Sequence, residues 1–222
     1  MIIQVSTPPL ESGDRLSRTE FERRYAQAPH LKAELIEGVV YVASPVRVRQ
    51  HGRPHAQLMT WLGTYAAATP GVDIADNSTV RLDLDNEPQP DALLRIEPEV
   101  GGGSRITEDD YIEGAPELVV EIAASSASVD LNAKLNAYRR NGVKEYLVWQ
   151  IYENQIRWFH LQDSEYVPLE LEAGVIKSRV FPGLWLEIGS LQQGDIAIVL
   201  SMLQTGLSSP EHQEFVDRLK QI

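Results

Sequence analysis

Short apolar runs, separated by turn and helix signals, form the clearest pattern in the middle of the chain. Residues 118–124 read Leu-Val-Val-Glu-Ile-Ala-Ala, and residues 145–151 and 155–161 are two further apolar runs on either side of Glu153-Asn154. Runs of this length that end at turn residues predict buried strands, the last two as a hairpin. Glu121 interrupts the first run, and an unpaired charge in a buried strand costs several kcal/mol.

The residues between the first two strands predict a helix. An apolar stripe at helical spacing is formed by Leu131, Leu135 and Tyr138. Asp130 can cap the helix N-terminus, and Asn141-Gly142 is a typical helix stop. Lys134 borders the apolar stripe, so a helix that packs back on the sheet would bring this lysine toward Glu121.

The remaining patterns predict one α/β domain with helical ends. Ser17 and Glu20 fit a capping box, so a helix is expected from there to about Gln27. The other expected elements are strands at 33–37, 39–43, 79–84 and 91–96, a helix at 54–68, a loop at 101–110, short strands within 166–187, and one or two helices from residue 191 onward.

Composition is that of an ordinary globular protein. The chain has 222 residues, of which 43% are hydrophobic and 23% charged. It has no cysteine, which excludes disulfides and thiolate metal sites. The N-terminus lacks the regions of a signal peptide and no apolar run is long enough to span a bilayer, so a cytoplasmic protein is expected.

The net charge of −12 weighs against sequence-independent binding to nucleic acid, which depends on Lys and Arg. One local segment differs from this balance, because residues 46–55 hold no acid and contain Arg47, Arg49, His51, Arg53 and His55. This segment either contacts phosphates or is solvated surface, and the same alternatives apply to Arg139, Arg140 and Lys144. The two histidines have a spacing that can bind a metal, but the intervening Pro54 favours a structural or phosphate-contact role.

Asp91, Glu121 and Lys134 form the candidate chemical site. Hard divalent ions such as Mg²⁺ take oxygen ligands, commonly one or two carboxylates together with waters and phosphate oxygens. Asp91, Glu121 and the backbone carbonyl of Ile122 could supply them. A lysine beside such a metal orients the attacking water, or acts as a general base if its pKa is lowered. Glu34 could add a further carboxylate.

Each of these residues also has a structural alternative. Asp91 follows a proline and can simply open a turn. Glu121 and Lys134 can be no more than a buried ion pair. On pattern alone, Glu34 is better explained as surface charge than as a ligand. The serines within 125–128 are better explained as turn and helix-start residues than as nucleophiles, because no glycine elbow surrounds them.

An ordered string of residues carries a family resemblance. It consists of Pro90-Asp91, Glu121, Ser125-Ser126, Asp130, Lys134, Tyr138, Gly142-Val143 and Glu145-Tyr146. In this pattern the chain resembles the Uma-two family of predicted restriction endonucleases, formerly a domain of unknown function, within the PD-(D/E)xK nuclease superfamily. The resemblance covers about residues 15–190, and the Glu34–Gly38 turn and His51 also match it.

The resemblance implies a restriction-endonuclease-like fold, with a mixed central sheet flanked by helices. It implies that Asp91 and Glu121 bind metal, that Lys134 is the catalytic lysine and that Glu34 is an auxiliary acid. The superfamily usually has its lysine two residues after the acid, where this chain has Ala123; Lys134 lies on the helix instead, as this family allows. The nuclease-like domain is expected at 17–190, after an extension at 1–16 and before a helical tail at 191–222.

Two functions are therefore predicted. The first is an endonuclease that hydrolyses DNA phosphodiester bonds with Mg²⁺ or Mn²⁺, and in which Arg49, His51 and Arg53 contact the nucleic acid. The second is an inactive nuclease fold that serves as a binding or regulatory module. The net charge favours the second and the acid–acid–lysine set favours the first. A homodimer would suit duplex cleavage, which needs two sites.

Overall fold

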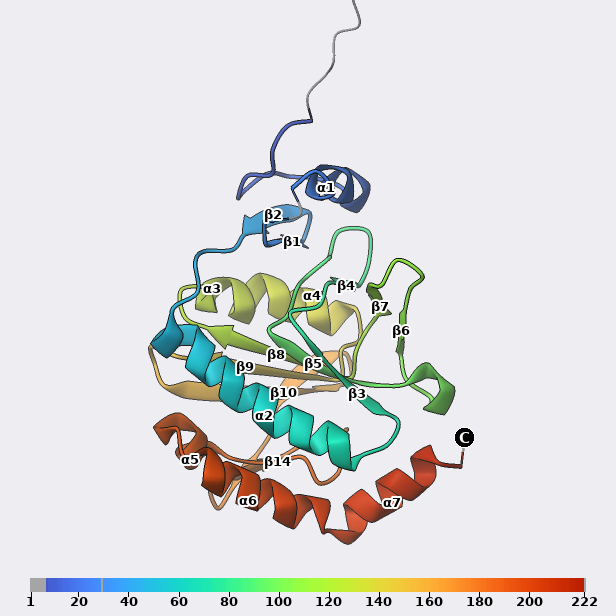
Figure 1. Cartoon of the computed structure of the whole chain (residues 1–222), viewed down its shortest axis with the longest axis vertical. Helices are drawn as coiled ribbons and strands as arrows, with labels where there is room; N and C mark the ends of the chain where they lie inside the picture. The colour runs from blue at the N-terminus through green and yellow to red at the C-terminus, as the bar shows by residue number, and fades with distance from the viewer. Residues whose placement is uncertain (1–6, 29, 222) are drawn as a thin grey trace, which may run out of the picture.

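A six-stranded mixed sheet lies at the centre of the computed structural model, which describes residues 7–28 and 30–221 (Figure 1). In sheet order its strands are β11 (Glu165–Pro168), β10 (Gln155–Gln162), β9 (Glu145–Gln150), β8 (Leu118–Ala123), β5 (Ala92–Ile96) and β3 (Val72–Asp76). Neighbouring strands are antiparallel except β8 and β9, which are parallel. Helices flank this sheet, so the predicted fold class is confirmed.

The parallel pair β8 and β9 is joined by a helical crossover, because parallel neighbours cannot be joined by a hairpin. The crossover comprises α3 (Ala127–Val129), the π-helical turn η3 (Asp130–Lys134) and α4 (Leu135–Arg140). The prediction that Asp130 caps this helix was wrong. Ser126 occupies the N-cap, and its hydroxyl donates to Asp130 Oδ2 at 2.6 Å inside the helix. Asp130 therefore faces the sheet, where it is buried.

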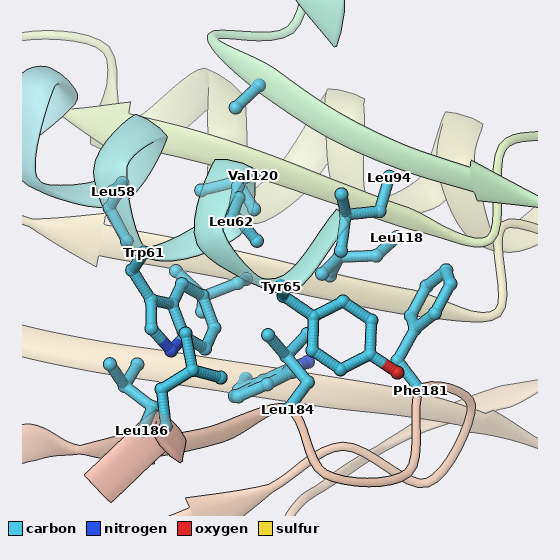
Figure 2. Close-up of a cluster of buried hydrophobic side chains, with 14 of the residues drawn as sticks. Leu58, Trp61, Leu62, Tyr65, Leu94, Leu118, Val120, Phe181, Leu184 and Leu186 are labelled. Atoms are coloured by element: carbon cyan, nitrogen blue, oxygen red, sulfur yellow. The ribbon is translucent and has the colours of Figure 1, made fainter. Parts of the chain in front are cut away.

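The two faces of β8 enter different hydrophobic clusters, as the alternation of its residues predicts. Leu118, Val120 and Ile122 pack under α2 (Arg53–Ala68), whose Leu58, Trp61, Leu62 and Tyr65 are buried (Figure 2). The polar tips in this cluster are satisfied, since Trp61 Nε1 donates to the Trp185 carbonyl at 3.0 Å and the Tyr65 hydroxyl to that of Pro182 at 2.9 Å. Val119 and Ala123 face the crossover helix, where they form a second cluster with Tyr138 of α4 and Tyr146 of β9. Glu121 lies on this second face.

The N-terminal part lies on the side of the sheet that α3 and α4 cover, away from α2 (Figure 1). Helix α1 (Arg18–Tyr25) begins at Ser17, whose hydroxyl accepts the Glu20 N–H. It packs with the hairpin β1 (Ala33–Ile36) and β2 (Val39–Val42), and Leu10 joins the same cluster. The hairpin is tied to the rest of the chain by a bridge between Leu35 and Glu87.

A small three-stranded sheet corrects two predictions. It consists of β4 (Val80–Arg81), β7 (Ile112–Gly114) and β6 (Ser104–Ile106). The strand expected at 79–84 is only two residues long, and the segment expected as a loop at 101–110 contains β6. Three residues are too few for an alternating pattern to stand out in the sequence. The short 3-10 helix η2 (Pro98–Val100) precedes strand β6.

The C-terminal part packs against the α2 side of the sheet (Figure 1). It contains the short strands β12 (Leu171–Glu172), β13 (Val175–Lys177) and β14 (Trp185–Glu187), and the helices α5 (Ile188–Gln193), α6 (Ile196–Leu207) and α7 (Pro210–Leu219). Ser209 caps α7 and Pro210 takes its first position, where its missing N–H costs nothing. Within the described residues, none of the helices has the length and apolar character needed to cross a membrane.

Candidate active site

Asp91 lies where strand β5 begins, at the edge that faces β8. Its Oδ2 accepts the Ile122 N–H at 2.8 Å, so the carboxylate satisfies a backbone donor of β8 just beyond the last ladder pair of β5 and β8, Ala92 with Val120. Its Oδ1 is 2.9 Å from His51 Nε2. Burial opposes charge on Asp91, but these hydrogen bonds and the charge of Lys134 lower the pKa of Asp91 below its ordinary value. Asp91 is thus an ionised acid held against the middle of β8.

Ile122 meets Asp91 through its N–H. Residues of a strand present their N–H and C=O at the same edge, so the Ile122 carbonyl also faces the Asp91 side of β8. This orientation is compatible with the predicted carbonyl ligand.

Glu121 is 4% exposed in the middle of β8. Its Oε1 accepts the Tyr138 hydroxyl and the Lys134 ammonium, each at 2.9 Å. Burial raises the pKa of Glu121 well above its ordinary value, and the neighbouring carboxylates raise it further, while Lys134 opposes both effects. The ionised form of Glu121 is therefore stable only when a cation such as the Lys134 ammonium lies beside it.

Lys134 reaches three carboxylates from the π turn. Its Nζ is 2.9 Å from Glu121 Oε1, 2.9 Å from Glu34 Oε1 and 3.7 Å from Asp130 Oδ1. Burial disfavours its charge, but the carboxylates outweigh burial and raise the pKa of Lys134 well above its ordinary value. Lys134 therefore carries a proton at neutral pH, which argues against the general-base alternative.

Glu34 lies inside the site, so the view of this residue as surface charge was wrong. Its side chain is 16% exposed, and its Oε1 accepts the Gln89 N–H at 2.7 Å besides pairing with Lys134. Hairpin β1–β2 positions it, because the bridge from Leu35 to Glu87 places the hairpin beside the segment that leads to Asp91.

The donor set of this cluster fits a divalent cation. Four carboxylates act on one another and on a single ammonium: Glu34, Asp91, Glu121 and Asp130 with Lys134. Asp130 Oδ1 is buried and has no hydrogen-bond partner within the described residues. Among those residues no group of three or more His, Asp and Glu side chains forms a ready-made metal shell. A Mg²⁺ site needs only one or two carboxylates when waters and substrate complete it.

His51 and His55 lie next to Asp91. The π-helical turn η1 (Val48–Gly52) runs directly into α2, and the two rings stack with centroids 5.6 Å apart. His55 Nε2 is 2.9 Å from the Asp91 carbonyl oxygen and 3.0 Å from Asp76 Oδ1. The three residues predicted to contact nucleic acid therefore lie in different surroundings. His51 is hydrogen-bonded to Asp91, whereas Arg49 and Arg53 are exposed.

Asp130 and Tyr138 are the site residues whose roles the sequence analysis missed. Asp130, Lys134 and Tyr138 lie on one helix face at i, i+4 and i+8, and all are buried, whereas Leu131 and Leu135 of the expected stripe are only half-buried. The spacing of Asp130 from Lys134 could have indicated this contact. The π turn η3 carries Asp130 and Lys134, and η1 carries His51, which contacts Asp91, in line with the frequent occurrence of such turns at functional sites.

The comparisons with known proteins agree with this fold and family. The family whose model matches residues 18–189 is described as Uma2, "Putative restriction endonuclease". No curated protein matches the chain. Among solved structures, the chain is similar to a protein from Anabaena variabilis ATCC 29413 described as "a putative nuclease belonging to DUF820", with 14% identity and a TM-score of 0.58 over 78% of this chain and 97% of that chain. That likeness supports the fold. Because the family model spans most of its residues, the chain belongs to the Uma2 family of restriction-endonuclease-like proteins.

Proposed function

We propose that this chain is a metal-dependent endonuclease that hydrolyses phosphodiester bonds in DNA. The observation that carries the proposal is that Asp91, Glu121 and Lys134 are buried close together. They come from the start of β5, from β8 and from the helical crossover that follows β8. A structural ion pair needs one acid for one lysine, whereas this lysine faces several. The surplus of carboxylates supports a site that takes up a cation.

Asp91 and Glu121 would hold the metal ion, with the Ile122 carbonyl as a further ligand. When bound, a divalent cation stabilises charge on phosphate oxygens and lowers the pKa of a bound water. Lys134 keeps its proton and can donate to the attacking water or to a phosphate oxygen as negative charge develops. Glu34 holds the lysine from the far side at 2.9 Å, and the Tyr138 hydroxyl fixes the Glu121 carboxylate.

The basic segment at 46–55 would contact the phosphate backbone beside the site. The ion pairs of its described residues involve the two histidines, and no carboxylate pairs with Arg47, Arg49 or Arg53 there. These arginines are exposed next to a histidine that touches Asp91. A local cationic patch of this kind can bind phosphates despite a net charge of −12.

Cleavage of supercoiled and single-stranded DNA with Mg²⁺ or Mn²⁺ tests this function. We expect wild type to cut, and Glu121→Gln and Lys134→Ala each to cut at least about 100-fold more slowly, since metal-assisted stabilisation contributes several kcal/mol. Glu108→Gln and Lys220→Ala are matched controls at exposed positions and should cut like wild type. Absence of cutting by wild type would contradict the proposal and favour the inactive binding module, whereas equal cutting by all variants would contradict the assignment of Glu121 and Lys134 to the active site.

A further inference from the structure

A run of seven consecutive exposed residues, 43–49, connects two parts of the chain that hold site residues. It follows β2, which pairs with the strand that carries Glu34. Its last residues enter η1, where the His51 ring contacts Asp91. Figure 1 shows this segment passing from β2 to the start of α2. Val48 is three residues before His51, and three residues span at most about 11 Å, so the segment lies beside the candidate active site.

Two apolar side chains of this segment project away from the protein. Val46 is 67% exposed and Val48 is 71% exposed, although valine is among the residues most often buried. The backbone of Arg47 between them is extended, with φ −104° and ψ 138°. Alternate side chains of an extended chain share a side, so the two valines project together and Arg47 projects the opposite way. The segment therefore has an apolar edge and a cationic edge.

The charge around the two valines indicates what covers them. Residues 43–55 contain no acid, and their three arginines, Arg47, Arg49 and Arg53, are all exposed. An occupant of this surface must therefore combine negative charge with apolar faces. A nucleic-acid strand meets both conditions, because its phosphates are anionic and its bases have flat faces on which side chains pack.

Apolar side chains that enter DNA between arginines have a known physical effect. They insert between neighbouring bases and partly unstack them, while the cations hold the phosphates on either side. The free energy needed to separate two bases depends on the sequence, and pyrimidine–purine steps such as TA are the most easily unstacked. A pair of inserted valines would therefore give a preference among DNA sequences without any hydrogen bond to a base edge.

We propose that Val46 and Val48 enter the base stack of the DNA whose phosphates the neighbouring arginines bind, so that the chain selects steps that unstack easily. The inference deepens the proposed function and rests on it, because it assumes that a DNA strand reaches the site at Asp91. It names the substrate class as DNA that is opened locally beside the scissile phosphate.

Binding of the full chain to short duplexes that contain 2-aminopurine tests the inference, in EDTA so that nothing is cut. This adenine analogue fluoresces more strongly when it is unstacked. One duplex places it in a central TA step, and a second duplex places it between G·C pairs. We expect wild type to raise the fluorescence of the first duplex and to bind it about tenfold more tightly than the second, the size of difference that base stacking provides.

The variants separate the apolar edge from the cationic edge. The double variant Val46→Ser with Val48→Ser should lose both the fluorescence rise and the preference, but keep the salt dependence of binding. Arg47→Ala with Arg49→Ala should weaken binding to both duplexes alike and reduce the salt slope by about 2, one for each phosphate contact. Ile106→Ser with Leu171→Ser, at two exposed apolar positions elsewhere, should behave like wild type. Thermal melting of the valine variant should match wild type, since neither side chain is buried.

The outcomes distinguish this inference from the proposed function. Absence of DNA binding, binding without a fluorescence rise, or a rise that the valine variant retains would overturn the inference even if wild type cuts DNA. A rise that depends on the valines, without any metal-dependent cutting, would overturn the nuclease and leave the inserted valines standing. If wild type self-associates in sedimentation and the valine variant does not, while both bind DNA equally, a second copy covers the valines and the inference is wrong.

Discussion

Glu121 on β8 and Glu145 on β9 are both buried on neighbouring strands, but their surroundings differ in kind. Glu145 is 0% exposed and accepts hydrogen bonds from neutral groups on both oxygens. The donors are Trp158 Nε1 at 3.1 Å, Ser178 Oγ at 2.8 Å, and the backbone N–H groups of Arg179 at 2.7 Å and Val180 at 3.2 Å. Glu121 accepts from one ammonium and one hydroxyl, and other carboxylates surround it.

The difference indicates which glutamate serves the fold and which serves the chemistry. The hydrogen-bond donors around Glu145 come from β10 and from the segment after β13, so its carboxylate links these parts to β9 and stabilises the fold. Around Glu121 the negative charges outnumber the positive ones, because several carboxylates lie close together and Lys134 neutralises them only in part. Such arrangements reduce stability and are typical of functional sites.

The largest expected effect on stability comes from removing the ammonium of the Glu121 cluster. Lys134→Met should lower the free energy of unfolding by about 3–5 kcal/mol at pH 8, because it leaves buried carboxylates without their cation. The loss should shrink at acidic pH as these carboxylates protonate. Urea unfolding followed by circular dichroism measures it, with the exposed Lys220→Met as control. A loss below about 1 kcal/mol would show that the lysine does not balance this cluster.

Replacing each glutamate by glutamine sharpens the comparison directly. Glu145→Gln should cost about 2–4 kcal/mol, because an amide NH₂ would face groups that are themselves donors. Glu121→Gln should change stability by less than about 1 kcal/mol, since it removes a charge that burial and its neighbours already disfavour while keeping an acceptor for Lys134. Thermal or urea unfolding measures both, and DNA cutting should show the reverse order of damage. Equal losses of stability would remove the distinction between a structural and a functional acid.

A further effect is expected in the pH dependence of stability. Burial raises the pKa of Glu145 to about 7 despite its four hydrogen bonds, from an ordinary value of 4.5. Its protonated form is thus favoured in the folded state, so its contribution to stability is full below about pH 4.5 and is lost as pH rises through about 7. Wild type should lose about 3 kcal/mol more than Glu145→Gln across this range, since the pKa is raised by roughly 2.5 units and each unit corresponds to about 1.4 kcal/mol. Parallel pH profiles of the two proteins would contradict the raised pKa.

Much of the fold follows from local pattern, and the site follows only in part. The runs that became β8, β9 and β10 are long and apolar enough to be recognised alone, and Glu121 stands out because it interrupts one of them. Two-residue and three-residue strands such as β4 and β6 are defined by their partners, so their own sequences carry little signal. Asp130 was assigned to a cap because aspartate prefers caps, but the π turn placed it beside Lys134. Only the family resemblance placed Glu34 at the site, since the pattern of residues cannot reveal a bridge between Leu35 and Glu87, which are far apart in sequence.

Titration of the protein with Mn²⁺ by calorimetry, without DNA, tests the central claim most directly. Wild type and Glu145→Gln, the latter below its melting temperature, should bind the ion with similar affinity. Glu121→Gln and Asp91→Asn should lose that binding, because each removes one carboxylate of the candidate metal site. Absence of binding by wild type, or binding that both of these variants retain, would contradict the assignment of Asp91 and Glu121 as the metal-holding acids.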